Sequence, residues 1–136
     1  MGLTEKRAIK AFQDTKYTEL VKEINTIAGF PVEFDVKWET LAEPEYSHMY
    51  EEGFTKVYFT PVINAFKGIA VDDMGKEALK ESVKKIVIKN ESGAYYGSAA
   101  YAFENGVLTI DHKPFTNIDD IQDRSKELEK LLSSKM

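Results

Sequence analysis

The stretch YAFENGVLTID, residues 101–111, decides the fold of this sequence because it predicts a β-hairpin. Asn105-Gly106 is a dipeptide preferred in the two-residue type I′ turn, and apolar residues flank it on both sides. Counting outward from this turn gives three facing pairs: Glu104–Val107, Phe103–Leu108 and Tyr101–Ile110. The four largest apolar side chains then fall on one face of the hairpin, so the register and the burial pattern agree.

Three more segments have the composition of strands. Residues 31–39, PVEFDVKWE, alternate strictly, with Val32, Phe34, Val36 and Trp38 on one face. Residues 54–62, FTKVYFTPV, alternate in the same way, and Pro61 should end that strand or lie at an edge. Residues 84–90, KKIVIKN, would form with the hairpin a three-stranded meander. The sequence therefore predicts about five strands.

Helical periodicity dominates both ends of the chain. Residues 3–28 repeat apolar side chains at helical spacing, with an expected break at QDTK and a C-terminal cap at Gly29. Residues 72–83 predict a short helix capped by Asp72 or Asp73, with Met74, Ala78 and Leu79 as its apolar stripe. A last helix runs to about residue 132, capped by Thr116 or Asn117. Residues 63–71 fit strand, helix or loop.

The order of these elements predicts an α+β fold. Strands cluster late and helices lie mostly at the ends, which favours an antiparallel sheet of about five strands with the N- and C-terminal helices packed on one face. The length of 136 residues predicts a single domain, 1–136.

Composition narrows the classes of function. The chain has no cysteine, which excludes disulfides, thiolate nucleophiles and cysteine-based zinc sites. A net charge of −5 argues against nucleic-acid binding, and no apolar run is long enough for a membrane span. These features predict a soluble, cytoplasmic protein without a cofactor.

An acidic region at residues 33–52 is the first candidate surface. It holds seven acids against the single base Lys37. Its candidate partner-binding residues are Glu43, Glu45, Tyr46, His48, Tyr50, Glu51 and Glu52. Acids and tyrosines together suit a basic protein partner. A histidine among carboxylates also suits proton transfer or a metal, but the spacing matches no metal motif, and a solvated acidic loop explains the pattern better.

A tyrosine-rich stretch, SGAYYGSAAYAF at residues 92–103, is the second candidate site. Small residues between tyrosines allow a ligand or a backbone to approach closely. Tyr95, Tyr96 and Tyr101, with Trp38, are the candidate lining of a ligand pocket. The alternative is an edge strand whose tyrosines pack on a helix.

Histidine and aspartates also gather late in the chain. Asp111 and His112 end the hairpin, and Asp119, Asp120 and Asp123 open the last helix. Folding could bring them together as a metal site. The favourable interaction of acids with the N-terminus of a helix explains the same pattern, and no metal is predicted.

The sequence contains no phosphate-binding loop, no nucleophile elbow and no HExxH motif, so no catalytic residue is assigned. We therefore hypothesise a protein-interaction module that self-associates as a homodimer, with an immunity or inhibitor protein as one version. The alternative is a small-ligand pocket, or an enzyme that uses His48 with nearby acids and tyrosines.

Overall fold

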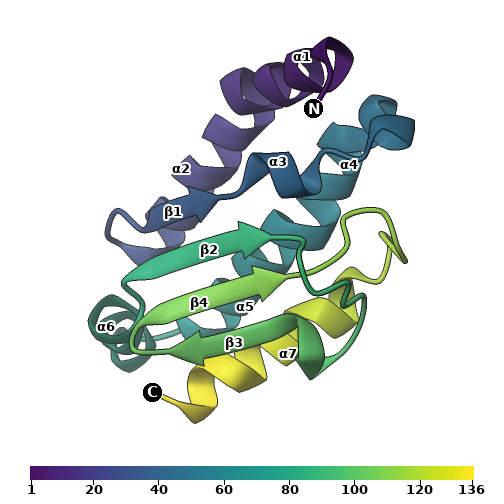
Figure 1. The fold of residues 1–136 in the computed structure, drawn as a ribbon. Coiled ribbons are helices and arrows are strands. Elements are labelled where there is room, and N and C mark those ends of the chain that lie inside the picture. The colour runs from purple at the N-terminus through teal and green to yellow at the C-terminus, as the bar shows by residue number, and fades with distance from the viewer.

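The computed structural model describes residues 1–136, and its fold is α+β (Figure 1). The helices are α1 (Leu3–Phe12), α2 (Thr18–Ala28), α3 (Trp38–Leu41), α4 (Tyr50–Phe54), α5 (Thr60–Ile69), α6 (Asp73–Ser82) and α7 (Ile121–Ser134). The strands are β1 (Glu33–Val36), β2 (Lys85–Lys89), β3 (Tyr101–Glu104) and β4 (Val107–Asp111). Short 3₁₀ segments cover Pro44–Met49 and Ser98–Ala100, and π-helical turns cover Gln13–Tyr17 and Thr55–Phe59.

The sheet is mixed and has four strands in the order β1-β2-β4-β3. The prediction of an antiparallel sheet of about five strands is therefore only partly right, because β3 and β4 are antiparallel but the other two pairs are parallel. β1 pairs with β2, and β2 with β4, in parallel. Helices α3 to α6 form the long crossover between β1 and β2, and residues 90–100 together with β3 form the connection between β2 and β4. After β2, residues 90–100 lead the chain to the outer edge of the sheet, where β3 lies. The hairpin then reverses the chain direction, so β4 and not β3 pairs with β2.

The hairpin itself has the predicted geometry. Asn105 and Gly106 both have positive φ, at 53° and 81°, as a type I′ turn requires. Phe103 pairs with Leu108, and Tyr101 pairs with Ile110. Local turn chemistry was therefore sufficient to set this register.

The segment 54–62, predicted as a strand, is helical. It lies inside a continuous helical stretch from Tyr50 to Ile69, which also settles the open residues 63–69 as helix. The buried residues recur at helical spacing and include Phe54, Val57, Tyr58, Val62 and Phe66. Pro61 is tolerated because the π-helical turn before it widens the backbone, where a regular helix would clash with the proline ring.

Helix ends follow the sequence in some places and depart from it in others. Gly29 ends α2 with φ at 81°, and the Asp72 side chain accepts a hydrogen bond from the Gly75 amide at the start of α6. The expected break near QDTK is a π-helical turn inside an unbroken helix. Met74 is 82% exposed, so it does not belong to the apolar stripe of α6.

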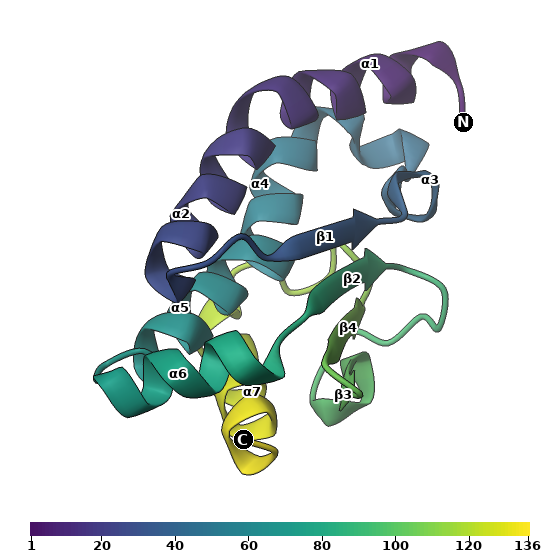
Figure 2. The same cartoon turned by 90° about the vertical axis from the view of Figure 1, so that its left-hand side faces the viewer.

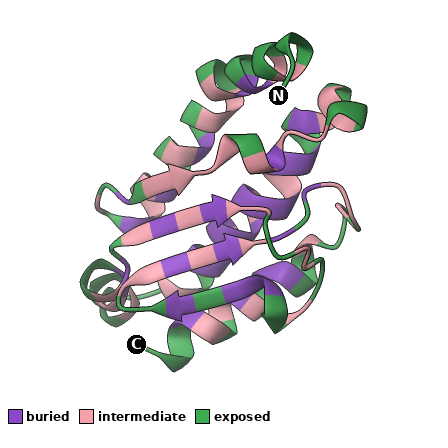
Figure 3. Cartoon of the chain, in the orientation of Figure 1, coloured by how far each residue is buried: buried purple, intermediate pink, exposed green.

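Helices cover one face of the sheet (Figures 1 and 2). α5 lies behind the sheet, α2 lies beside it near β1, and α7 lies near β3. The strand residues that face the helices are buried, and they include Ile86, Ile88, Leu108 and Ile110 (Figure 3). The other face is partly exposed. No helix has both the length and the apolar composition needed to cross a bilayer.

Candidate functional site

The residues of the predicted acidic surface fall into two groups, tyrosines that pack inside the protein and side chains that lie at its surface. Tyr50 is buried, and its hydroxyl donates a hydrogen bond to the Glu43 carbonyl. Tyr46 stacks on Phe115 with ring centroids 4.7 Å apart. The other side chains of the region lie at the surface: Glu43, Glu45, His48, Glu51 and Glu52. No three metal-ligating side chains come together here or elsewhere in the chain.

The predicted pocket residues separate into two groups. Tyr95, Tyr96 and Tyr101 line a common hollow, which we call the tyrosine pocket. Trp38 does not reach it. Its ring lies 5.1 Å from that of Tyr17 and 5.9 Å from that of Phe12, within a closed aromatic cluster. The tyrosines are therefore brought together, and the tryptophan is partly buried and packs against the core.

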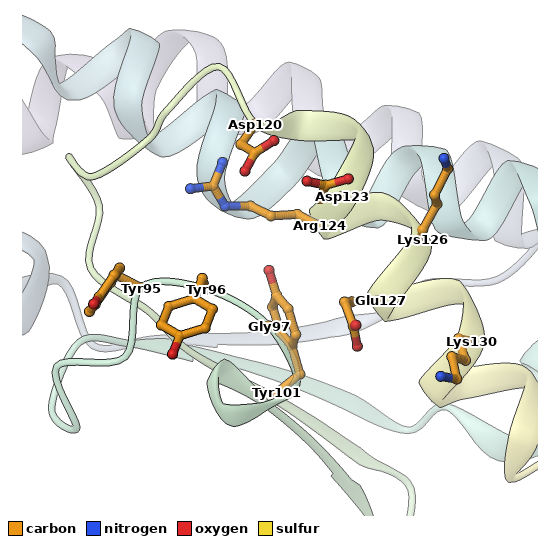
Figure 4. A pocket seen from close by; sticks show the side chains of 10 residues that line it. All are labelled: Tyr95, Tyr96, Gly97, Tyr101, Asp120, Asp123, Arg124, Lys126, Glu127 and Lys130. Carbon is orange, nitrogen blue, oxygen red and sulfur yellow. The ribbon is translucent and has the colours of Figure 1, made fainter.

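The tyrosine pocket lies between the loop that precedes β3 and the first turns of α7 (Figure 4). Its volume is about 460 Å³. The lining residues are Tyr95, Tyr96, Gly97, Tyr101, Asp120, Asp123, Arg124, Lys126, Glu127 and Lys130. The charged residues therefore all come from α7 and its N-cap, and the aromatic residues from the loop and β3.

Arg124 is a buried residue of this lining, with only 5% of its surface exposed. Its Nε donates to His112 Nε2 at 3.2 Å, and its Nη2 donates to the Thr116 carbonyl at 2.8 Å. Its Nη1 is buried and has no hydrogen-bond partner. These bonds hold the segment before α7 in a loop, so α7 begins at Ile121 with Asp120 as N-cap instead of at the predicted Thr116 or Asn117.

Tyr101 supplies a second unpaired group. It is 8% exposed, and its hydroxyl is buried without a partner. Burial raises the pKa of Tyr101 to about 12, so the hydroxyl keeps its proton and remains a donor. Figure 4 shows its ring rising from β3 with the hydroxyl directed toward the Arg124 side.

His112 holds the Arg124 side chain in position by accepting a hydrogen bond from its Nε. The imidazole is fully buried, with Nδ1 2.6 Å from the Lys113 carbonyl. Because Nε2 accepts from Arg124, the proton belongs on Nδ1, which donates to that carbonyl. Burial lowers the pKa of His112 to about 4, so the ring is neutral near pH 7. Tyr58 supports this arrangement by donating from its hydroxyl to the His112 carbonyl.

The charge of Arg124 has no counterion. None of the ion pairs in the structure includes this residue. Asp120 and Asp123 lie nearby on the same helix but remain solvent-exposed. The alternative of a metal site at Asp111, His112 and the aspartates around the start of α7 is not supported, because no three such ligands come together and Arg124 donates to Nε2 of His112.

A flap, defined here as residues Tyr95–Gly97, closes one side of the pocket. Tyr95 and Tyr96 are 45% and 67% exposed, and their ring centroids lie 4.9 Å apart. The loop before the flap is fixed by Asp111, whose Oδ1 accepts from the Glu91 and Ser92 amides. Gly93 and Gly97 on either side of the tyrosines have positive φ, at 79° and 66°. Both glycine positions therefore have a backbone conformation that glycine adopts more readily than other residues.

Sequence reasoning missed Arg124. A signal was present, because Arg124, Leu128 and Leu132 recur every four residues on one face of α7, and an arginine on an apolar stripe is buried with it. The role of His112 had no such signal, since its partner lies 12 residues later in the chain.

Comparisons with models of protein families, with curated proteins and with solved structures gave no match to this chain.

Proposed function

We propose that this protein binds a small molecule in the tyrosine pocket. The observation that carries the proposal is the pair of buried, unpaired polar groups, the Tyr101 hydroxyl and Arg124 Nη1, beside a hollow of about 460 Å³. Leaving a buried donor unpaired costs about 1–3 kcal/mol, so natural proteins retain few of them. A bound molecule that accepts both hydrogen bonds would remove this cost.

Three further properties support a binding site. The pocket volume falls within the range of small-ligand sites, about 300–1,000 Å³. The rings of Tyr95 and Tyr96 offer exposed aromatic surface at the flap. The shifted pKa values of Tyr101 and His112 occur at the same site, and such shifts concentrate where proteins bind or react with ligands.

The test is a fragment screen monitored by amide NMR, preceded by native mass spectrometry of the purified protein. We expect a copurified mass or fragment-induced shifts that are confined to the flap and the first turns of α7. The variant Tyr95→Ala/Tyr96→Ala should weaken binding, whereas Glu51→Ala/Glu52→Ala, which alters the acidic surface, should leave it unchanged. Shifts at residues 43–52 alone, or no shifts, would contradict the proposal.

Binding of a basic protein partner is the second proposal. It is supported by Glu43, Glu45 and Glu51, none of which forms an ion pair with a cation of this chain. Neutralising these three and Glu52 together should abolish capture of the partner from a lysate without unfolding the chain. Self-association as a homodimer and a cytoplasmic location belong to the same proposal, and native mass spectrometry tests the first.

A further inference from the structure

We infer that the ligand of the tyrosine pocket carries a carboxylate, which acts as the counterion of Arg124 and accepts a hydrogen bond from Tyr101. This inference rests on the proposed function and specifies its ligand. The ligand class is a small carboxylic acid whose remaining part is flat and apolar.

The first step is the charge of Arg124. The side chain is buried, and both of its hydrogen-bonded partners, His112 Nε2 and the Thr116 carbonyl, are neutral acceptors. A buried cation is strongly unfavourable unless an anion compensates it. His112 cannot supply that charge, because it is neutral near pH 7 and has no anionic form in this range. No acid of the chain forms an ion pair with Arg124, so a bound anion would be its first close counterion.

The second step is the geometry of the free donors. Nε and one N–H of Nη2 of Arg124 are occupied, so Nη1 is the guanidinium nitrogen that has no partner in the protein. The Tyr101 hydroxyl is the second donor, and it is aimed toward the same side chain (Figure 4). Two donors match the two oxygens of a carboxylate. Donors paired with an ionised acceptor form stronger hydrogen bonds than neutral pairs do.

The third step separates a carboxylate from a phosphate. The remaining charged lining consists of the acids Asp120, Asp123 and Glu127 and the bases Lys126 and Lys130. These acids repel a dianion more strongly than a monoanion. These acids therefore favour a monoanionic carboxylate over a dianionic phosphate in this pocket. The exposed rings of Tyr95 and Tyr96 then favour a flat apolar body on the acid.

The fourth step concerns access. Neither Nη1 nor the Tyr101 hydroxyl is in contact with solvent, so a ligand reaches them only when the covering residues shift. The flap is suited to this movement. Its amides form no hydrogen bond within the protein, and its own backbone contact is a long one of 3.4 Å from the Ala100 amide to the Gly97 carbonyl. The chain is held just before the flap, where the Ala94 carbonyl accepts from the Lys113 amide at 2.8 Å. The flap can therefore move without disturbing β3.

The experiment compares acids with their neutral amides. Benzoate, phenylacetate and cinnamate are titrated beside benzamide, phenylacetamide and cinnamamide, with phenyl phosphate as the dianionic arm, and binding is followed by amide NMR and thermal shift. We expect at least one acid to bind about tenfold more tightly than its amide and than phenyl phosphate, as expected for one charged hydrogen bond. Its affinity should fall as salt is added.

The variant Tyr101→Phe removes one hydroxyl that has no partner in the protein, so it should fold normally and bind the acid about tenfold more weakly. Tyr17→Phe is the matched control, because that partly buried tyrosine packs on Trp38, outside the pocket. It should bind the acid as the parent does.

The outcomes distinguish the two proposals. If amides bind as tightly as acids, the proposed small-molecule site is supported and the carboxylate inference is wrong. If phenyl phosphate binds more tightly than every acid, the anion is a phosphate and the choice of a carboxylate is wrong. If acids fail to bind while other fragments from the general screen do bind, the inference fails alone. If nothing binds at the pocket, the proposed function fails with it.

Discussion

Two aromatic regions of this molecule use similar residues for opposite purposes. In the aromatic cluster, Phe12, Tyr17, Phe34, Trp38, Phe54 and Phe59 pack ring against ring, with centroids 5.1–6.5 Å apart. In the tyrosine pocket, Tyr95, Tyr96 and Tyr101 surround a hollow and leave a buried hydroxyl unpaired. The difference shows that aromatic composition alone does not distinguish a core from a binding site.

The physical cause of this difference is the backbone that carries each set. The aromatic cluster is built from three segments, two long helical stretches and β1 with the start of α3, so rings approach from several sides and fill the space. Tyr95 and Tyr96 lie on a loop that only α7 faces, and the side chains of α7 at that position are charged. Charged side chains favour solvent and cannot fill the hollow, which therefore persists.

The largest expected effect is the difference in stability lost when a ring is removed from each of the two regions. Phe54→Ala removes a fully buried ring from the centre of the aromatic cluster, and it should lower the free energy of unfolding by about 3–5 kcal/mol. Tyr96→Ala removes a ring that is 67% exposed and should change the free energy by less than about 0.5 kcal/mol. Urea unfolding measures both. Equal losses would show that the tyrosines contribute to the core.

A smaller effect tests the buried histidine of the pocket. The pKa of His112 is about 4 in the folded protein and about 6.5 when unfolded, so the unfolded state binds more protons between these values. Stability supplied by the neutral ring is present above about pH 6.5 and is lost as the pH falls toward 4. The loss between pH 7 and 4.5 should reach about 2–3 kcal/mol.

Two variants isolate this contribution from that of the carboxylates. His112→Gln should show a shallower decline of stability with falling pH than the parent protein. His48→Gln, which alters an exposed histidine, should follow the parent curve. Unfolding in urea at a series of pH values gives the comparison. A parent-like slope in His112→Gln would show that His112 does not titrate in this range.

The smallest effect compares two buried tyrosines that differ in one hydrogen bond. Tyr58→Phe removes a hydroxyl that donates to the His112 carbonyl, and it should cost about 1–2 kcal/mol. Tyr101→Phe removes a hydroxyl without a partner, so stability should stay unchanged or rise by up to about 1 kcal/mol. Thermal unfolding of both variants measures the difference. A marked loss in Tyr101→Phe would reveal a hydrogen bond to that hydroxyl in solution.

Some features could be predicted because their causes are local. The Asn105-Gly106 turn fixes the hairpin register, Gly29 ends its helix, and Asp72 begins the next. The tyrosines of the pocket could also be named, because small residues set them apart in the sequence. Each of these signals lies within a few residues of the feature that it predicts.

The prediction of other features failed because one apolar pattern fits both a strand and a helix. In residues 54–62 the alternation of Val57 and Phe59 with Lys56 and Tyr58 suits a strand, but Tyr58 is fully buried beside them. Helical spacing accounts better for the buried residues, which include Phe54, Val57, Tyr58 and Val62. Only packing against the first long helix decides between these periods, because β-propensity depends strongly on context.

The sequence by itself determined the hairpin, the helix ends at Gly29 and Asp72 and the acidic, cysteine-free composition, because each depends on neighbouring residues or on counts. The tertiary structure alone decided the strand order, the helical state of residues 54–62, and the meeting of Arg124, His112 and Tyr101. Those outcomes depend on contacts between distant segments, and the free energy of such contacts depends on the space that the other elements leave.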